Sequence, residues 1–237
     1  MDPMPALSQI AARLRKRYAP PQPRPRSDNP LDSLIQTLLS QNTTAANSAR
    51  AYANLRRHFP TWEMVHRASL RDLVAVLRPG GLANIKAVWI KALLEDIREE
   101  QGHFNLSFLR DLTDQEVRAY LERFRGIGGK TMACVLLFDL GRPAFPVDTH
   151  VFRVCRRLGL LDGARSPEKA QALLEARVPP RDCHALHVHL VEHGRQTCTA
   201  RRPDCDACIL AVLCDHARRG VPGKMTNLLT GTPQSGR

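Results

Sequence analysis

Long apolar runs are absent from this sequence of 237 residues. None approaches the roughly 20 residues that a membrane-spanning helix needs. Residues 1–17, MDPMPALSQIAARLRKR, also lack the apolar stretch of a secretory signal peptide. We therefore expect a cytosolic or nuclear protein without membrane contact, and a cytoplasmic, nucleoid-associated one if its source is bacterial.

Convincing alternation of polar and apolar residues, the pattern of a half-buried strand, is missing as well. In LDSLIQTLLSQ, residues 31–41, the apolar residues instead recur at helical spacing and share one face. Capping patterns indicate further helix starts at three places, which are Ser69 with Asp72, Thr113 with Glu116, and Ser166 before Pro167. Gly194, after DCHALHVHLVEH, predicts a helix end. The sequence therefore predicts an all-α fold.

Acidic residues are outnumbered by basic ones. The chain has 35 lysines and arginines against 23 aspartates and glutamates, a formal net charge of +12. Such a charge favours a polyanionic partner, nucleic acid above all, although it could equally serve solubility.

Three glycines lie within four positions of FRGIGGKTMACVLLF, residues 124–138. Glycine lets a chain turn sharply and approach another group closely, because it carries no Cβ. A turn of this kind before a helix directs backbone N–H groups outward, where they can hold a DNA phosphate without sequence preference. The alternative is a connection between two helices whose glycines only permit tight packing. The glycine motif alone leaves both interpretations open.

Lys130 follows the glycines and opens a helix with an apolar interior. A positive helix end and partial desolvation both favour the neutral amine. A lysine that ordinarily titrates near 10.4 could thereby approach the roughly 7 to 8 that suits an amine nucleophile. The alternative is a plain cation that contacts phosphate.

Asp148 stands in GRPAFPVDTHVFRV, directly before a second apolar helical period. An aspartate at this place can be an N-cap that stabilises the helix by about 1 kcal/mol. Backbone N–H groups that hold its carboxylate would also keep it ionised and facing a cationic centre. The two roles are compatible in one residue.

The seven cysteines are not expected to form disulfides in a reducing compartment. Four of them have the spacing C-x6-C-x2-C-x5-C, namely Cys198, Cys205, Cys208 and Cys214. This compactness indicates a metal site, and chemistry alone places zinc before an iron–sulfur cluster because zinc is the commoner structural ion. The metal would brace a loop that carries Arg201 and Arg202 for phosphate contact. The remaining three fall in apolar helical patterns as core thiols: Cys134, Cys155 and Cys183.

Together, the hairpin, VDTHVFRV and HGRQTC with the four-cysteine spacing resemble the helix-hairpin-helix DNA glycosylase superfamily, and within it the endonuclease III family. The resemblance implies a bilobed all-α enzyme. A six-helix barrel lobe would span residues 31–141, and an iron–sulfur cluster lobe would span 142–222. The basic, proline-rich residues 1–30 would pack partly on the cluster lobe, and 223–237 would form a flexible tail.

The resemblance also implies roles for single residues. Lys130 matches the family's Schiff-base nucleophile, Asp148 its essential carboxylate, and Glu122 a supporting acid. The four cysteines match the ligands of a 4Fe–4S cluster. Positions that contact DNA in the family are matched by the hairpin residues Gly126, Ile127, Gly128 and Gly129, by the wedge residue Leu82, and by Asn42 with Gln41 beside it, either of which could fill the space of a flipped base.

The implied activity is that of a bifunctional DNA glycosylase and AP lyase of base excision repair, which removes oxidised pyrimidines through a lysine Schiff base. Its partner would be double-stranded DNA with damaged bases or abasic sites, and we expect a monomer. One alternative is a monofunctional mismatch or adenine glycosylase. Another is a DNA-binding or redox-sensing module with weak catalysis.

Overall fold

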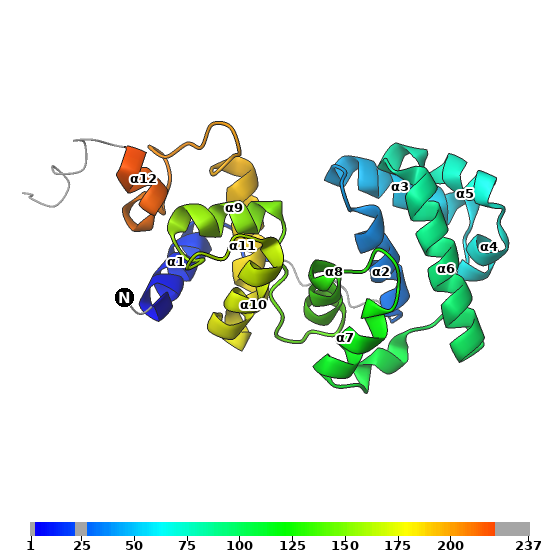
Figure 1. Ribbon diagram of the computed structural model, residues 1–237. Coiled ribbons are helices and arrows are strands. Elements are labelled where there is room, and N and C mark those ends of the chain that lie inside the picture. The colour runs from blue at the N-terminus through cyan, green and yellow to red at the C-terminus, as the bar shows by residue number, and fades with distance from the viewer. Residues whose placement is uncertain (1–2, 22–27, 221–237) are drawn as a thin grey trace, which may run out of the picture. The chain divides into compact units, whose positions relative to one another are not determined.

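A computed structural model describes residues 3–21 and 28–220 of the chain (Figure 1). Every regular element among these residues is a helix, which confirms the all-α prediction. No helix in these two ranges is both long and apolar enough to cross a bilayer. The expected tail, 223–237, lies outside the described residues, as do residues 22–27 of the proline-rich segment.

The chain divides into two compact units. One unit, here called the cysteine unit, combines Met1–Pro21 with Val147–Arg237. The other, here called the hairpin unit, consists of Gln22–Pro146. Lys130 therefore belongs to the hairpin unit, whereas Asp148 and the four closely spaced cysteines belong to the cysteine unit.

The hairpin unit is a group of short helices around one long one. Its elements are α2 (Pro30–Leu39), α3 (Ala45–His58), α4 (Trp62–Arg67), α5 (Leu70–Leu77), η1 (Arg78–Gly80), α6 (Ala83–Gln101), η2 (Ser107–Arg110), α7 (Asp114–Glu122), α8 (Gly129–Cys134) and η3 (Val135–Asp139). Helix α6 packs on α2, α4, α5 and η1, while α2 also contacts α3, α8 and η3. The core of this unit thus lies between α2 and α6.

Helix α2 forms as its apolar spacing predicts. The Asn29 side chain caps it by accepting a hydrogen bond from the Leu31 N–H at 3.1 Å, and Pro30 stands at the first helical position. Its leucines and its isoleucine are fully buried. The predicted capping box of Thr113 and Glu116 at the start of α7 is confirmed too, with both reciprocal hydrogen bonds present.

The cysteine unit joins the N-terminal helix to the C-terminal part of the chain. Its elements are α1 (Pro3–Arg17), α9 (Thr149–Leu158), α10 (Pro167–Arg177), η4 (Pro180–Asp182), α11 (Cys183–Gln196), η5 (Ala211–Leu213) and α12 (Asp215–Gly220). Helix α11 packs against α9 and α1, and α12 packs against α9 (Figure 1). Helix α1 buries an apolar face that includes Leu7, Ile10 and Leu14. The N-terminal segment is therefore part of this unit's core.

Gly194 corrects the predicted end of the helix before the cysteines. Helix α11 runs through it to Gln196, and Thr197 follows as the C-cap. A Cβ at Gly194 would lie 2.9 Å from the Cβ of His150 on α9, closer than two carbon atoms can approach. The glycine serves the close packing of α9 on α11 and does not end the helix.

Candidate active site and cysteine cluster

The glycine turn between α7 and α8 depends on a close approach of Trp89. Gly126 has φ +82°, and a Cβ there would lie 2.4 Å from Cε3 of the Trp89 ring. Only glycine meets both conditions without strain. Gly128, by contrast, has extended backbone and caps α8 with no atom near its missing Cβ. Within the turn, Gly128 is exposed to solvent and the Ile127 side chain is buried.

Lys130 is the second residue of α8 and is half-buried. Its amine has neither a hydrogen bond nor an ion pair among the residues that the structure describes. The helix continues directly into η3, and the residues that follow Lys130 are buried from Thr131 to Leu137. The Lys130 amine thus stands on a helix with a buried apolar interior, and no carboxylate in the described part of the chain pairs with it. Glu122, the last residue of α7, is exposed.

Gln41 is tied to the glycine turn. Its Nε2 donates to the carbonyl oxygen of Gly126 at 2.7 Å and lies 3.3 Å from Oγ1 of Thr131. The end of α2 therefore supports the turn that precedes Lys130. Spacing in the sequence gave no signal of this contact, because the two residues are 85 positions apart.

Asn42 and Leu82 share an unusual backbone conformation. Both have positive φ, +52° for Asn42 and +50° for Leu82, which is uncommon for residues with a Cβ. Asn42 is exposed, and the Leu82 side chain is 47% exposed. A strained, exposed leucine at the start of α6 suits a residue that inserts into another molecule.

Asp148 is the N-cap of α9, as its sequence position predicts. Its Oδ1 accepts a hydrogen bond from the Val151 N–H at 2.7 Å. This bond fixes the orientation of the carboxylate at the N-terminal end of α9. The second oxygen, Oδ2, is not used by the cap and is available for chemistry.

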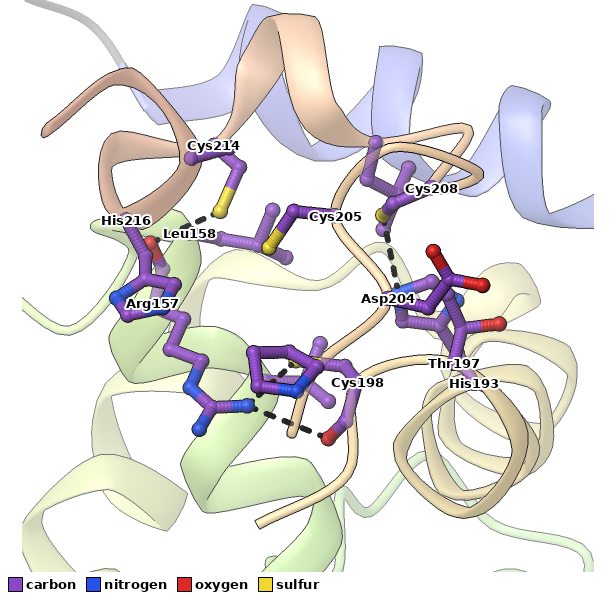
Figure 2. Close-up of a pocket in the computed structure, with 14 residues that line it drawn as sticks. Arg157, Leu158, His193, Thr197, Cys198, Asp204, Cys205, Cys208, Cys214 and His216 are labelled. Carbon is purple, nitrogen blue, oxygen red and sulfur yellow. Dashed lines mark hydrogen bonds between the residues drawn. The ribbon is translucent and has the colours of Figure 1, made fainter. Parts of the chain in front are cut away.

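The four closely spaced cysteines line one pocket of the cysteine unit, between the end of α11 and the start of α12 (Figure 2). Burial raises the pKa of Cys208 to about 11, and the neighbouring thiols Cys198, Cys214 and Cys205 add to the effect. The pKa of Cys205 is raised for the same reasons. Four thiolates in such a pocket need positive charge from a bound metal group.

The donor set fits a cluster. All four cysteines line the same pocket. A cube of four irons takes one thiolate at each iron, so its four ligands stand farther apart than the ligands of one zinc ion. Thiol sulfurs distributed around the pocket in Figure 2 suit that arrangement.

Arg157 of α9 holds the segment that begins at Cys198. Its Nη1 lies 3.2 Å from Sγ of Cys198 (Figure 2). The same Nη1 donates to the carbonyl oxygen of Thr199 at 2.7 Å, and Nη2 donates to the carbonyl oxygen of Ala200 at 3.0 Å. The carbonyl oxygen of Arg157 in turn lies 3.2 Å from Sγ of Cys214. One residue therefore reaches both ends of the four-cysteine segment.

His193 approaches the pocket from α11. Its Nε2 lies 3.6 Å from Sγ of Cys208 (Figure 2). Its Nδ1 lies 3.0 Å from the hydroxyl of Tyr18. Burial, with a smaller contribution from Arg17, lowers the pKa of His193 to about 4, so the imidazole is neutral. Arg201 and Arg202 are exposed on the loop between Cys198 and Cys205. Within this loop, the Thr199 hydroxyl donates a hydrogen bond to the carbonyl oxygen of Arg202 at 2.6 Å.

Two family models match the chain. The model of the HhH-GPD superfamily base excision DNA repair proteins matches residues 35–180, and that of the iron-sulfur binding domain of endonuclease III matches 198–214. The chain belongs to the HhH-GPD superfamily. It is a DNA glycosylase of base excision repair, of the endonuclease III type. Its four-cysteine segment holds a 4Fe–4S cluster. The family resemblance therefore predicted the metal group correctly, whereas the preference for zinc from chemistry alone was wrong.

Relatives in several organisms resemble the chain along much of its length. Endonuclease III of Haemophilus influenzae is 31% identical over 211 residues, which cover 89% of this chain and 95% of the relative. Endonuclease III of Sulfolobus acidocaldarius is 32% identical over 190 residues, 79% of this chain and 82% of the relative. A candidate DNA glycosylase of Arabidopsis thaliana is 41% identical over 165 residues, but the chain spans only 56% of that protein.

Solved structures of this superfamily share the fold. A non-covalent endonuclease III–DNA complex has a TM-score of 0.80 and 26% identity, with 93% of this chain and 99% of the other covered. A trapped endonuclease III–DNA covalent intermediate has a TM-score of 0.74 and 26% identity, with 91% and 95% covered. Both of these solved structures are complexes of endonuclease III with DNA.

Proposed function

We propose that the protein is a bifunctional DNA glycosylase and AP lyase that removes oxidised pyrimidines from duplex DNA, with Lys130 as its nucleophile. The observation that carries the proposal is the placement of Lys130. Lys130 is half-buried in the first turn of α8, a helix with an apolar interior. Its amine has no carboxylate partner among the described residues. Such an amine is not held by a counter-charge and can approach the sugar carbon that it would attack.

The chemistry follows from an amine beside an extruded nucleotide. Lys130 Nζ attacks C1′ of the deoxyribose, the bond from C1′ to the base breaks, and its electron pair leaves with the base. The sugar ring opens as the nitrogen loses a proton, which gives an imine between Lys130 and C1′. The imine acidifies the C2′ proton, and its removal expels the 3′ phosphate, so the strand breaks on the 3′ side of the lesion.

Asp148 is the proposed carboxylate of this reaction. The Val151 N–H fixes one of its oxygens at 2.7 Å, which restricts the orientation of the carboxylate. Its other oxygen would stabilise positive charge on the sugar or accept the proton that the amine releases. Glu122 would support it as a further acid.

Lesion recognition is proposed to depend on the exposed residues of the hairpin unit. A damaged base stacks poorly, so its extrusion costs less than that of a normal base. Because the Gln41 side chain is bound to Gly126, the exposed Asn42 is the better candidate to fill the vacated space. Leu82 would be the wedge between bases. The hairpin residues Gly126 to Gly129, with Arg201 and Arg202 of the other unit, would contact phosphates.

The cluster's proposed role is structural. When bound, it crosslinks the four thiolates, so that the loop with Arg201 and Arg202 keeps one shape. Arg157 contributes to the same end by binding the carbonyl oxygens of Thr199 and Ala200. The monomeric state and the cytoplasmic location expected from the sequence stay predictions.

Assays on defined duplexes test the proposal. Wild-type protein should release thymine glycol and 5-hydroxycytosine, nick the product strand, and leave a mispaired adenine in place. Lys130→Gln should lose the strand nick, while Lys169→Gln, a change at an exposed lysine of α10, should keep it. Base release without nicking in the wild-type protein would favour the monofunctional alternative. Binding without either reaction would favour the DNA-binding module.

A further inference from the structure

Lys86 is a fully buried lysine that the proposed reaction does not use. Its side chain is 1% exposed, in the first turn of α6. Lysine is almost never fully buried unless its charge or its N–H groups are paired. Burial lowers the pKa of this amine, yet the neutral form still has two N–H groups to donate. A buried amine at the positive end of a helix needs a specific reason.

The partners of Lys86 supply that reason. Its Nζ donates to the carbonyl oxygen of Leu39 at 2.8 Å and to that of Gly80 at 3.0 Å. Leu39 is the last residue of α2, where carbonyl oxygens lack partners within the helix. Gly80 is the last residue of η1, and a Cβ there would lie 2.9 Å from that of Ala51 on α3. One amine thus joins the end of α2 to the end of η1.

Each of the two segments leads to exposed residues with a proposed role in DNA. Gln41 and Asn42 follow Leu39 by two and three positions, and Leu82 follows Gly80 by two. The backbone N–H of Lys86 also donates to the carbonyl oxygen of Leu82 at 3.0 Å. The Lys86 side chain therefore binds Leu39, which directly precedes the segment 40–44, and Gly80 within the segment 78–82. The Lys86 backbone binds Leu82 at the end of that second segment.

We propose that Lys86 is a positioning residue that sets the spacing between the wedge residue Leu82 and the space-filling residue Asn42, so that both enter the duplex together when a base is extruded. This inference rests on the proposed function of these two residues. A buried apolar side chain of similar size would leave the carbonyl oxygens of Leu39 and Gly80 without this donor, so the lysine serves to hold these two oxygens. Asn42 at φ +52° and Leu82 at φ +50° both have strained backbone. Their separation stays constant only if the chain segments that carry them cannot move apart.

The test compares Lys86→Met with Leu93→Ala in the cluster-loaded protein. Methionine keeps the length of the side chain but donates to neither carbonyl oxygen. Leu93, on the same helix and 1% exposed, has an apolar side chain that makes no hydrogen bond to either segment, so its variant reports the effect of a weakened core. Lys86→Gln, which can restore one of the two bonds, is the second variant in case Lys86→Met does not fold.

Amide hydrogen exchange in the DNA-free protein is the first measurement. Lys86→Met should speed exchange in residues 40–44 and 78–82 together, by about ten-fold or more relative to Leu93→Ala. Lys86→Gln should lie between wild type and Lys86→Met. Unchanged exchange in either segment would overturn the proposal. This measurement needs no activity, so it decides the structural part even if the proposed function fails.

Single-turnover kinetics are the second measurement. Base excision by Lys86→Met should fall by about ten-fold or more, whereas strand nicking at a preformed abasic site should change by less than about three-fold, because no base has to be extruded there. Leu93→Ala should affect both reactions alike. Equal loss in both reactions of Lys86→Met would overturn the proposal. So would a slow Lys86→Met beside fully active Leu82→Ala and Asn42→Ala variants, whereas failure of the proposed function would appear as wild-type protein that excises no base.

Discussion

Gln41 donates a hydrogen bond from Nε2 to the carbonyl oxygen of Gly126 at 2.7 Å, and this bond connects the end of α2 to the turn before Lys130. This bond favours Asn42 over Gln41 as the residue that would fill the space of a flipped base. A side chain that supports the hairpin has lost the freedom to enter the duplex, while its neighbour Asn42 is exposed. We therefore expect the two adjacent amides to have separate tasks.

Substitution should separate these tasks. Gln41→Ala removes support from the hairpin backbone, so it should weaken binding to undamaged and abasic duplexes alike, by about ten-fold if the hydrogen bond contributes 1 to 1.5 kcal/mol. Asn42→Ala should leave undamaged binding unchanged and slow excision under single-turnover conditions. Fluorescence anisotropy and quenched-flow excision measure the two effects. The reverse pattern would return the space-filling role to Gln41.

Gly126 is expected to be less replaceable than Gly128. Gly126→Ala must adopt φ +82° and displace the Trp89 ring from a distance of 2.4 Å, so it should lose at least about 1 to 2 kcal/mol of unfolding free energy. Gly128→Ala has open space and ordinary φ, and should change stability by less than about 0.5 kcal/mol. Denaturant unfolding measures both. Adding Trp89→Leu to Gly126→Ala should restore part of the loss, and equal stability of the two single variants would contradict the account of the turn.

Much of this hairpin unit could be predicted from local patterns, and its connections could not. The apolar face of α2 and the capping box of Thr113 and Glu116 are set by residues within four positions, so the sequence shows them directly. Lys86 carries no such signal, because the carbonyl oxygen of Leu39 is 47 positions away. The single hint of its burial in the sequence is that Lys86 begins the mostly apolar stretch KAVWIKALL, residues 86–94.

The cysteine unit shows the same division. The spacing of the four cysteines and the cap at Asp148 are local, and both were found in the sequence. The contact of His193 with Tyr18 spans 175 positions, and Arg157 reaches Cys198 across 41, so neither could be read from spacing. Gly194 misled for the same reason, because its role depends on His150 of another helix.

Asp148 should reveal its structural and chemical roles through different substitutions. Asparagine can accept the Val151 N–H bond as aspartate does, so Asp148→Asn should change unfolding free energy little, while Asp148→Ala should lose about 1 kcal/mol. Both variants should slow base excision by about a hundred-fold or more, since neither carries the charge. Thermal unfolding and single-turnover excision are the measurements. Full excision by a well-folded Asp148→Asn would leave Asp148 as a cap alone.

Arg157 should matter for retention of the cluster, and its neighbour Arg156 should not. Arg157→Met removes the bonds to Thr199 and Ala200 and the contact with the Cys198 sulfur, so the segment around the cluster should loosen. Purified wild-type protein should be brown and absorb near about 400 nm, and Arg157→Met should lose that absorbance faster in the presence of a chelator. Arg156→Met, at an exposed position, is the matched control. Equal rates of loss would contradict the role of Arg157.

Mapping of a reduced protein–DNA adduct tests the central assignment most directly. Wild-type protein incubated with abasic-site duplex and borohydride, then digested, should yield one modified peptide in mass spectrometry, with the reduced sugar on Nζ of Lys130. Lys130→Gln should bind the same duplex and give no adduct. An adduct on any other residue of wild-type protein, or an undiminished yield in Lys130→Gln, would contradict the assignment of Lys130 as the nucleophile.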